Sequence, residues 1–331
     1  MKEALFYKKL EDNKVQCQLC PQNCIISEGK SGLCFGRTNI DGKLIAENYG
    51  KTISISLDPI EKKPLYHFYP GTDILSIGPN GCNLRCQFCQ NYQISQKRSH
   101  TKSIQPEEIV RYCEKVNSIG IAFTYTEPLV WYEFILDSAK LLRKQNKKVV
   151  LITNGTINEE PLLKLLPFVD AMNIDLKAMS EEFYKKYCSG FLETVKATIK
   201  VASQITHVEI TYLLIPDLND SEEEIHKLVD FIAELDKKIP LHFSRYFPRY
   251  KLQKPITSEK TMKIAYKIAK EKLDYVYVGN IFISGTANTH CPQCGESLIE
   301  RSGYDVFVRN ITQNNCCKKC GYKIKGVHLF A

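Results

Sequence analysis

Three cysteines lie within one short stretch, at Cys82, Cys86 and Cys89, with the spacing C-x3-C-x2-C and an aromatic residue just before the third. Three thiolates on one tight loop can bind three irons of a cubane [4Fe-4S] cluster, which normally takes four cysteines. The fourth iron would then be open to an exogenous ligand. The alternatives are a zinc knuckle that lacks a ligand, or three structural thiols. Chance rarely produces this spacing from 14 cysteines in 331 residues, so the cluster is favoured.

Two further sets of four cysteines have the spacing of metal ligands. The set near the start of the chain, C-x2-C-x3-C-x9-C, predicts a closed four-thiolate site, with structural zinc favoured and an auxiliary iron–sulfur cluster as the alternative. The set near the end contains two C-x2-C-Gly knuckles and predicts a zinc ribbon, in which the metal stabilises a tail too short for a large core. The predicted ligands are Cys17, Cys20, Cys24 and Cys34 in the first set, and Cys291, Cys294, Cys317 and Cys320 in the second.

Two details of the second set stay open at this stage. Cys316 could replace Cys317, and His290 could compete for the first ligand position. Strands at 304–308 and 322–324 would form the sheet of the ribbon. We expect this unit either to dock a partner or to cover the active site.

The elements that must position these cysteines alternate between strand and helix from about residue 72. Regular alternation implies a parallel sheet with right-handed crossovers. Six or seven units are too few for a closed barrel of eight, so the pattern predicts an α/β fold with a partial (β/α)6 barrel. Strands are predicted at 74–77, 120–125, 148–153, 171–175, 207–215, 241–245 and 274–278, and helices at 106–118, 128–144, 181–204, 222–235 and 259–272.

The same pattern divides the chain into three parts. A cysteine-rich metal-binding segment would span residues 1–60, the barrel 61–285, and the zinc-ribbon-like unit 286–331. In a parallel barrel the functional site lies at the carboxyl ends of the strands. Polar residues gather there in this chain, strand after strand, which a purely structural barrel would not require.

At these residues the chain resembles the radical S-adenosylmethionine (SAM) superfamily, whose signature is C-x3-C-x-aromatic-C. The stretches 58–71, 89–95 and 124–128 are similar to a subgroup, the AmmeMemoRadiSam system radical SAM enzymes, which are relatives of the pyruvate formate-lyase activating enzyme. The resemblance implies that Cys82, Cys86 and Cys89 bind the [4Fe-4S] cluster and that SAM binds its open iron. It also implies the partial barrel fold.

The resemblance also suggests which residues contact SAM. Each has a structural alternative, such as an internal salt bridge for Asp175 with Lys177, an ordinary turn for Asn154, a helix-start acid for Glu127, or a core histidine for His242. The family's double glycine before the acid is replaced by Tyr125 and Thr126. The candidates are Phe88 beside the adenine, Glu127 on the amino group, Thr153 and Asn154 near the ribose and carboxylate, Lys177 near the carboxylate, Asp175 near a cation, and His242 in the pocket.

The resemblance implies an oxidoreductase-like activity: reductive cleavage of SAM to a 5′-deoxyadenosyl radical that abstracts hydrogen from a substrate. That substrate would be a protein glycine, as in the activation of glycyl-radical enzymes, or a Memo-like or AMMECR-like partner, with electrons from an external donor. The alternatives are radical modification of RNA or of a small molecule, and a non-enzymatic metal-bearing scaffold that docks partners.

Composition sets the remaining limits. The formal net charge of +8 suggests binding to nucleic acid. This charge falls to about +3 if two four-thiolate zinc sites contribute −2 each and the three-thiolate cluster about −1, so the suggestion weakens. No run of 18 apolar residues predicts a membrane span, and the charged first ten residues are unlike a signal peptide. Fourteen cysteines in an unsecreted chain favour metal sites over disulfides, so we expect a cytoplasmic protein.

Overall fold

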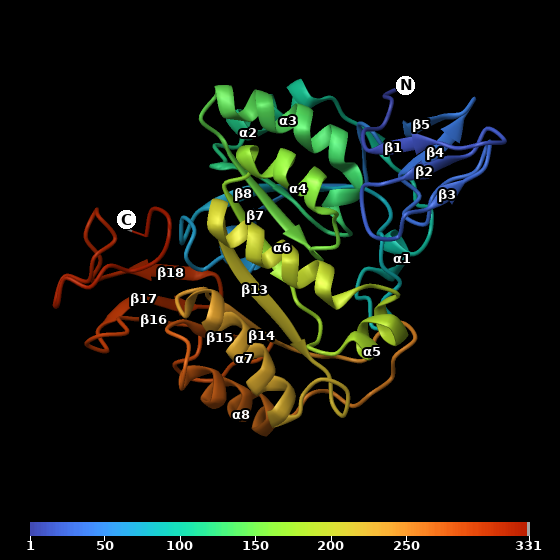
Figure 1. Ribbon diagram of the computed structural model, residues 1–331. Helices are drawn as coiled ribbons and strands as arrows, with labels where there is room; N and C mark the ends of the chain where they lie inside the picture. The colour runs from blue at the N-terminus through green and yellow to red at the C-terminus, as the bar shows by residue number, and fades with distance from the viewer. Residues whose placement is uncertain (330–331) are drawn as a thin grey trace.

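The computed structural model describes residues 1–329, and its central sheet contains seven parallel strands in chain order. An eighth strand, β7, pairs antiparallel with β8 at one edge. All seven strands expected from the sequence are confirmed to within three residues at each end, and together they form the partial barrel (Figure 1). The strands are β7 (Ser54–Pro59), β8 (Asp73–Gly78), β10 (Gly120–Phe123), β11 (Lys148–Thr153), β12 (Ala171–Asp175), β13 (His207–Leu214), β14 (Leu241–Arg245) and β15 (Val276–Gly279).

Helices cover the outer face of this sheet, and their ends follow local sequence signals. At the start of α2, Gln105 and Glu108 form a reciprocal capping box, and Pro106 occupies the first helical position. Ser221 and Ser258 cap two later helices by accepting a hydrogen bond from the backbone three residues on. The helices are α1 (Tyr92–Ser95), α2 (Pro106–Lys115), α3 (Tyr132–Lys144), α4 (Glu159–Leu165), α5 (Glu181–Phe183), α6 (Leu192–Ile205), α7 (Glu222–Asp236) and α8 (Glu259–Lys270).

Two helical segments differ from the sequence-based expectation. The segment at 181–204 is not one helix, because a π-helical turn at 184–188 ends in Ser189, whose φ of 52° lies in the left-handed region. Helix α6 begins after this interruption, at Leu192. Helix α4 was not predicted at all. No helix within residues 1–329 is long and apolar enough to cross a membrane.

The amino-terminal segment forms small antiparallel sheets that dock against α3. A buried ion pair joins Arg37 to Glu133 at 2.6 Å, and the Trp131 indole donates to the backbone oxygen of Asn48 at 2.6 Å. Figure 1 shows this segment in blue, at the same side of the barrel as α1. Its strands are β1 (Tyr7–Lys9), β2 (Val15–Cys17), β3 (Ile25–Ile26), β4 (Arg37–Ile40), β5 (Lys43–Ala46) and β6 (Lys51–Thr52), the last paired with β9 (Lys102–Ser103).

The carboxyl-terminal unit packs at the opposite side of the barrel (Figure 1). Its sheet consists of β16 (Thr289–His290), β17 (Ser297–Ser302) and β18 (Asp305–Val308). The strand expected at 322–324 is wrong, since only a single bridge joins Lys323 to Cys316 there. The expected division of the chain at residues 60 and 285 stays a prediction; the barrel sheet itself begins at Ser54, and the last two residues of the third part lie outside the described residues.

A buried polar network fastens this unit to the amino ends of the strands. The carboxylate of Glu209 on β13 accepts hydrogen bonds from the backbone of Tyr66 and His67 at 3.0 and 2.7 Å. The ring of His67 in turn bonds the backbone oxygen of Lys325 and the hydroxyl of Tyr277, each at 2.6 Å. The ribbon therefore closes the end of the barrel remote from the cysteine loop. The expectation that it covers the active site is wrong.

Candidate active site

A cavity of about 360 Å³ lies at the carboxyl ends of the parallel strands. Its wall brings together residues that follow five different strands, as expected for a site in this class of fold. Of the residues predicted to bind the cluster or SAM, eight line this cavity. They are Cys82, Cys86, Phe88, Cys89, Thr153, Asn154, Asp175 and Lys177.

The loop that carries the three cysteines is held on both flanks. The backbone N–H of Gly81 donates to Ile94 at 2.9 Å, and that of Arg85 donates to Cys188 at 2.7 Å. Gly81 has a φ of 98°, and a Cβ there would lie 2.0 Å from the backbone oxygen of Cys34. A side chain at this position would therefore separate the loop from the amino-terminal segment.

The surroundings of the three sulfurs suit a bound iron–sulfur cluster. Hydrogen bonds to thiolate sulfur tune such clusters, and Cys82 Sγ accepts from the backbone of Leu84 at 3.3 Å and from Asn154 Nδ2 at 3.5 Å. Cys89 Sγ lies 3.1 Å from Ser95 Oγ. Burial raises the pKa of the Cys82 thiol well above its usual value, so a bound cation is needed to stabilise the thiolate.

Lys177 and Asp175 line the cavity as an ion pair, with Nζ and Oδ2 3.1 Å apart. Burial disfavours the charge on Lys177, but the neighbouring Asp175 carboxylate and Cys86 outweigh it and raise the pKa of the lysine well above its usual value. The lysine is thus a permanent cation beside the cysteine loop. The salt bridge that the sequence analysis gave as the structural alternative is present, and both of its residues line the cavity.

Glu127 lies outside the cavity wall. Its side chain is fully buried and accepts hydrogen bonds from Thr153 Oγ1 at 2.7 Å, the backbone of Asn154 at 2.7 Å and the backbone of Leu129 at 3.0 Å. Burial raises the pKa of Glu127 to about 7. Both carboxylate oxygens accept hydrogen bonds within the protein, so Glu127 holds the 153–154 turn in place, and its contact with the SAM amino group stays a prediction.

His242 also lies away from the cavity. Its Nε2 atom is 2.6 Å from Glu209 Oε2, within the network that closes the amino end of the barrel. Its ring packs edge-on against Tyr66, with centroids 4.8 Å apart. His242 is only the second residue of β14, whereas Ser244, two residues nearer the carboxyl end, lines the cavity. His242 is thus a buried histidine bonded to Glu209, and its role in the SAM pocket stays a prediction.

Sequence reasoning assigned no role to the residues that line the cavity between β7 and β10. Lys62 and Lys63 each place Nζ 2.7 Å from the Asp58 carboxylate, and the Tyr125 hydroxyl donates to the same carboxylate at 2.7 Å. Burial opposes ionisation of Asp58, yet the hydrogen bonds from the two lysines prevail and hold its pKa well below the usual value. The sequence signals were the stretches 58–71 and 124–128, which contain Asp58, both lysines and Tyr125.

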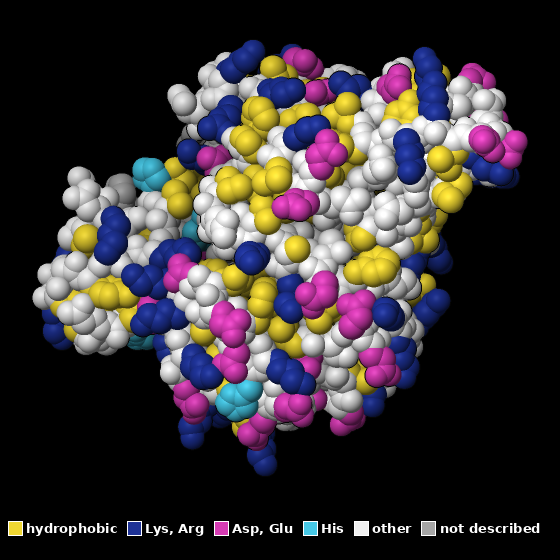
Figure 2. All heavy atoms as spheres, viewed as in Figure 1, with side chains coloured by type: hydrophobic (Ala, Val, Ile, Leu, Met, Phe, Trp, Pro, Cys, Tyr) yellow, Lys and Arg dark blue, Asp and Glu magenta, His cyan; other side chains and the backbone are white. Residues whose placement is uncertain are grey.

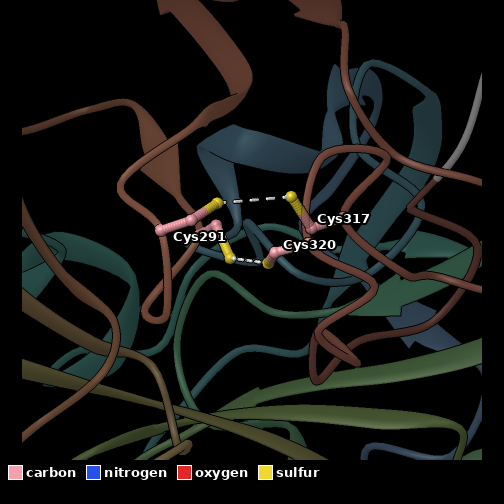
Figure 3. A group of neighbouring side chains, drawn as sticks. Cys291, Cys317 and Cys320 are labelled. Atoms are coloured by element: carbon pink, nitrogen blue, oxygen red, sulfur yellow. Dashed lines mark hydrogen bonds between the residues drawn. The ribbon is translucent and has the colours of Figure 1, made fainter.

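The four cysteines of the ribbon form a compact group. Their sulfurs all lie within 4.8 Å of one another, with Cys291 3.5 Å from Cys320 and Cys294 3.7 Å from Cys317. Figure 3 shows the sulfurs pointing toward a common centre. Four thiolates at zinc–sulfur distances of about 2.3 Å would lie about 3.8 Å apart in a tetrahedron, so the group fits one metal ion. Neither Cys316 nor His290 belongs to it.

The four amino-terminal cysteines, Cys17, Cys20, Cys24 and Cys34, line a second cavity. It lies behind the cysteine loop, since Asn83 also lines it. The Asn83 side chain accepts a hydrogen bond from Asn154 Nδ2 at 3.0 Å, which joins the walls of the two cavities.

Comparison with known proteins identifies the class. A family profile described as the radical SAM superfamily matches residues 76–230, and the chain belongs to this superfamily of enzymes. The chain is 47% identical over 332 residues to an uncharacterized protein of Methanocaldococcus jannaschii, a match that covers 98% of this chain and 99% of that one. It is 28% identical over 168 residues to the pyruvate formate-lyase-activating enzyme of Clostridium pasteurianum, covering 47% of this chain and 67% of that enzyme.

Among solved structures, Streptococcus suis SuiB bound to S-adenosylmethionine has a TM-score of 0.50 with this chain at 14% identity, over 67% of this chain and 53% of SuiB. At this identity the likeness concerns the fold alone. Membership of a superfamily of enzymes favours catalysis over the scaffold alternative.

Proposed function

We propose that this chain cleaves SAM reductively at a [4Fe-4S] cluster held by Cys82, Cys86 and Cys89, and that the radical formed acts on a partner protein. The observation that carries the proposal is the shared cavity wall, on which three cysteines of one loop face Asn154 and Lys177. When bound, the reduced cluster supplies the single electron that splits SAM into methionine and a 5′-deoxyadenosyl radical.

The residues around the cysteines would orient SAM for this step. Lys177, whose side chain is 14% exposed, is a cation suited to the methionine carboxylate, because charge-assisted hydrogen bonds are the stronger ones. Asn154 is held rigidly, since its side chain donates to Asn83 at 3.0 Å and accepts from the backbone of Thr156 at 2.8 Å. Phe88, which is 4% exposed, gives the wall an apolar surface that excludes water from a reactive radical.

The test is anaerobic SAM cleavage, with 5′-deoxyadenosine as the measured product. We expect product from the reconstituted wild-type protein with dithionite, and none above background from Cys86→Ala. Cys113→Ala is the matched control, because Cys113 is equally buried but lies on α2, where its thiol donates to the backbone of Gly120. Cleavage retained by Cys86→Ala, or lost equally in Cys113→Ala, would count against the assignment.

We further propose that the substrate is a glycine of a partner protein, in a cytoplasmic system supplied by an external electron donor. The similarity to a pyruvate formate-lyase-activating enzyme supports this choice, and the partner would be a Memo-like or AMMECR-like protein if the subgroup resemblance holds. Hydrogen abstraction can be traced by isotope: partner candidates made with α-deuterated glycine should transfer deuterium to 5′-deoxyadenosine. Product without deuterium would rule out a glycine substrate.

RNA is the second candidate substrate, because the rim of the cavity is both aromatic and basic. Gln90 on the cavity wall donates to the backbone of Phe247 at 3.3 Å, which begins an exposed loop. In that loop Tyr250 stacks on Tyr92 with ring centroids 4.6 Å apart, and Arg249 lies over Tyr92. Stacking rings and cations suit a single-stranded nucleic acid.

The charge pattern of the face drawn in Figure 2 gives RNA less support. On the face drawn in Figure 2, Lys and Arg side chains are interspersed with Asp and Glu. If RNA is the substrate, Arg249→Ala should weaken RNA binding and reduce its salt dependence. Undetectable RNA binding by the wild-type protein at low salt would remove this candidate.

A further inference from the structure

We propose that the four amino-terminal cysteines, Cys17, Cys20, Cys24 and Cys34, bind a second iron–sulfur cluster and not the zinc ion that their spacing favours. The assignment rests on four features of this site: the separation of its sulfurs, the shape of its loop, the buried donors beside it, and the origin of its walls. None of them depends on the reaction proposed above.

The separation of the sulfurs distinguishes the three cysteine sets of this chain. In the ribbon, four sulfurs lie within 4.8 Å of one another, as one metal ion requires. Within residues 1–329, no three of the amino-terminal sulfurs satisfy that limit, and neither do the sulfurs of Cys82, Cys86 and Cys89. In a cubane each cysteine binds a different iron, so its thiolates stand farther apart than the ligands of a single ion. The amino-terminal set therefore resembles the cluster loop and not the ribbon.

The loop shape gives the same distinction. Each ribbon knuckle closes with a glycine N–H that donates to the first cysteine, from Gly295 to Cys291 and from Gly321 to Cys317, both at 2.9 Å. The amino-terminal set has no such glycine, and Pro21 follows its second cysteine. Instead, it places three cysteines in eight residues as C-x2-C-x3-C, the reverse order of the C-x3-C-x2-C loop, and takes its fourth from Cys34. One short loop in each case can wrap three corners of a cubane.

Two buried donors beside these cysteines have no hydrogen-bond partner among residues 1–329. Arg37 Nε and Thr156 Oγ1 are both unpaired, their residues are 1% and 0% exposed, and both residues line the cavity. An unpaired buried donor costs about 1–3 kcal/mol, so such groups signal a missing acceptor. The sulfides and thiolates of a cluster supply more acceptor atoms than four thiolates on one zinc ion.

The walls of the cavity complete the surroundings that a cluster needs. Leu19 and Ile26 come from the amino-terminal segment, while Leu129 and Val130 come from the barrel. These apolar side chains keep solvent from the sulfurs, a condition that shifts the reduction potential of a cluster. Because Gly81 contacts the backbone oxygen of Cys34, the two cysteine sets are neighbours across a single layer of backbone.

The experiment counts metals in the full-length protein, produced and purified anaerobically. In the variant with Cys82, Cys86 and Cys89 all replaced by Ala, we expect about four iron and four sulfide per chain to remain, with visible charge-transfer absorbance and one zinc. A chain with no iron and two zinc would overturn the proposal.

A second variant tests the proposal independently, in case the triple-Ala variant does not fold. Cys20→Ser with Cys34→Ser should lower iron from about eight to about four per chain, while zinc stays at one. Iron unchanged at about four in both the wild type and this variant would also overturn the proposal. Cys113→Ala is the matched control and should keep the full complement. Because these readouts are metal content and absorbance, they stand apart from SAM cleavage, which can fail independently.

Discussion

Replacing Glu209 by glutamine should destabilise the closed end of the barrel by about 2–4 kcal/mol, a value that follows from its hydrogen bonds. Oε1 accepts from the backbone of His67 at 2.7 Å and from His207 Nε2 at 3.0 Å. Oε2 accepts from the backbone of Tyr66 at 3.0 Å and faces His242 Nε2 at 2.6 Å. A glutamine keeps one oxygen, and its amide nitrogen then faces one of the two backbone donors.

That donor loses its acceptor whichever way the amide turns, because a backbone N–H cannot change its role. One unpaired buried donor costs about 1–3 kcal/mol, and the loss of charge from the remaining bonds adds about 1 kcal/mol. Urea denaturation at pH 7, followed by circular dichroism, measures the change. Glu223→Gln is the matched control, because Glu223 lies exposed on α7 and bonds only Lys227 among the described contacts.

The pH dependence adds a second measurement on the same variant. Burial opposes the charge on Glu209, but hydrogen bonds from His207 and His242 prevail and hold its pKa well below the usual value of a glutamate. A carboxyl group with a depressed folded pKa stabilises above its unfolded pKa and loses that contribution as pH falls through the folded value. The gap between wild type and Glu209→Gln should therefore be constant from pH 8 to pH 6 and narrow in acid. Equal midpoints at pH 7 would refute the reasoning.

Three further predictions concern the cavity and the ribbon. Burial raises the pKa of Glu127 to about 7 from 4.5, so the free energy of unfolding of the cluster-free protein should fall by about 1 kcal/mol between pH 6 and pH 8. Glu127→Gln should abolish this pH dependence. An unchanged pH dependence in urea titrations of the variant would contradict the prediction. Lys177→Met should weaken SAM binding about tenfold or more in equilibrium dialysis with iron content unchanged, and equal affinity would exclude a carboxylate contact. Cys317→Ser should lose the ribbon metal while Cys316→Ser keeps it, as metal analysis will show; the reverse pattern would reassign the ligand.

Much of the fold could be predicted because its signals are local. The barrel strands are short apolar runs, and they appear where the alternation placed them, from β8 (Asp73–Gly78) to β15 (Val276–Gly279). The ribbon ligands were readable for the same reason, since two knuckles with fixed internal spacing leave little choice. Even Cys317 was selected correctly over its neighbour Cys316, whose sulfur lies outside the group.

Side-chain direction could not be predicted, because it depends on register and on partners far away in the sequence. Glu127 follows a strand at the correct end, yet its carboxylate turns to the backbone of Asn154, 27 positions later. His242 lies on a barrel strand, but near the start of it, where Glu209 is its partner. Lys62 and Lys63 pair with Asp58 nearby in the sequence, but their place in the cavity wall depends on β7 lying beside β8 and on Tyr125 reaching the same carboxylate from 67 positions away.

The second cavity is lined by residues from distant parts of the chain, and this affects how the protein folds during synthesis on the ribosome. Synthesis runs from the amino terminus, so Cys34 is made long before Val130 and Thr156, which enclose the same cavity. The amino-terminal cysteines must therefore wait, reduced and exposed, until half of the polypeptide has emerged. The four ribbon cysteines span only residues 291–320, so that group is complete within about thirty residues of synthesis. The first cysteines to be synthesised are thus enclosed only after residues made more than a hundred positions later.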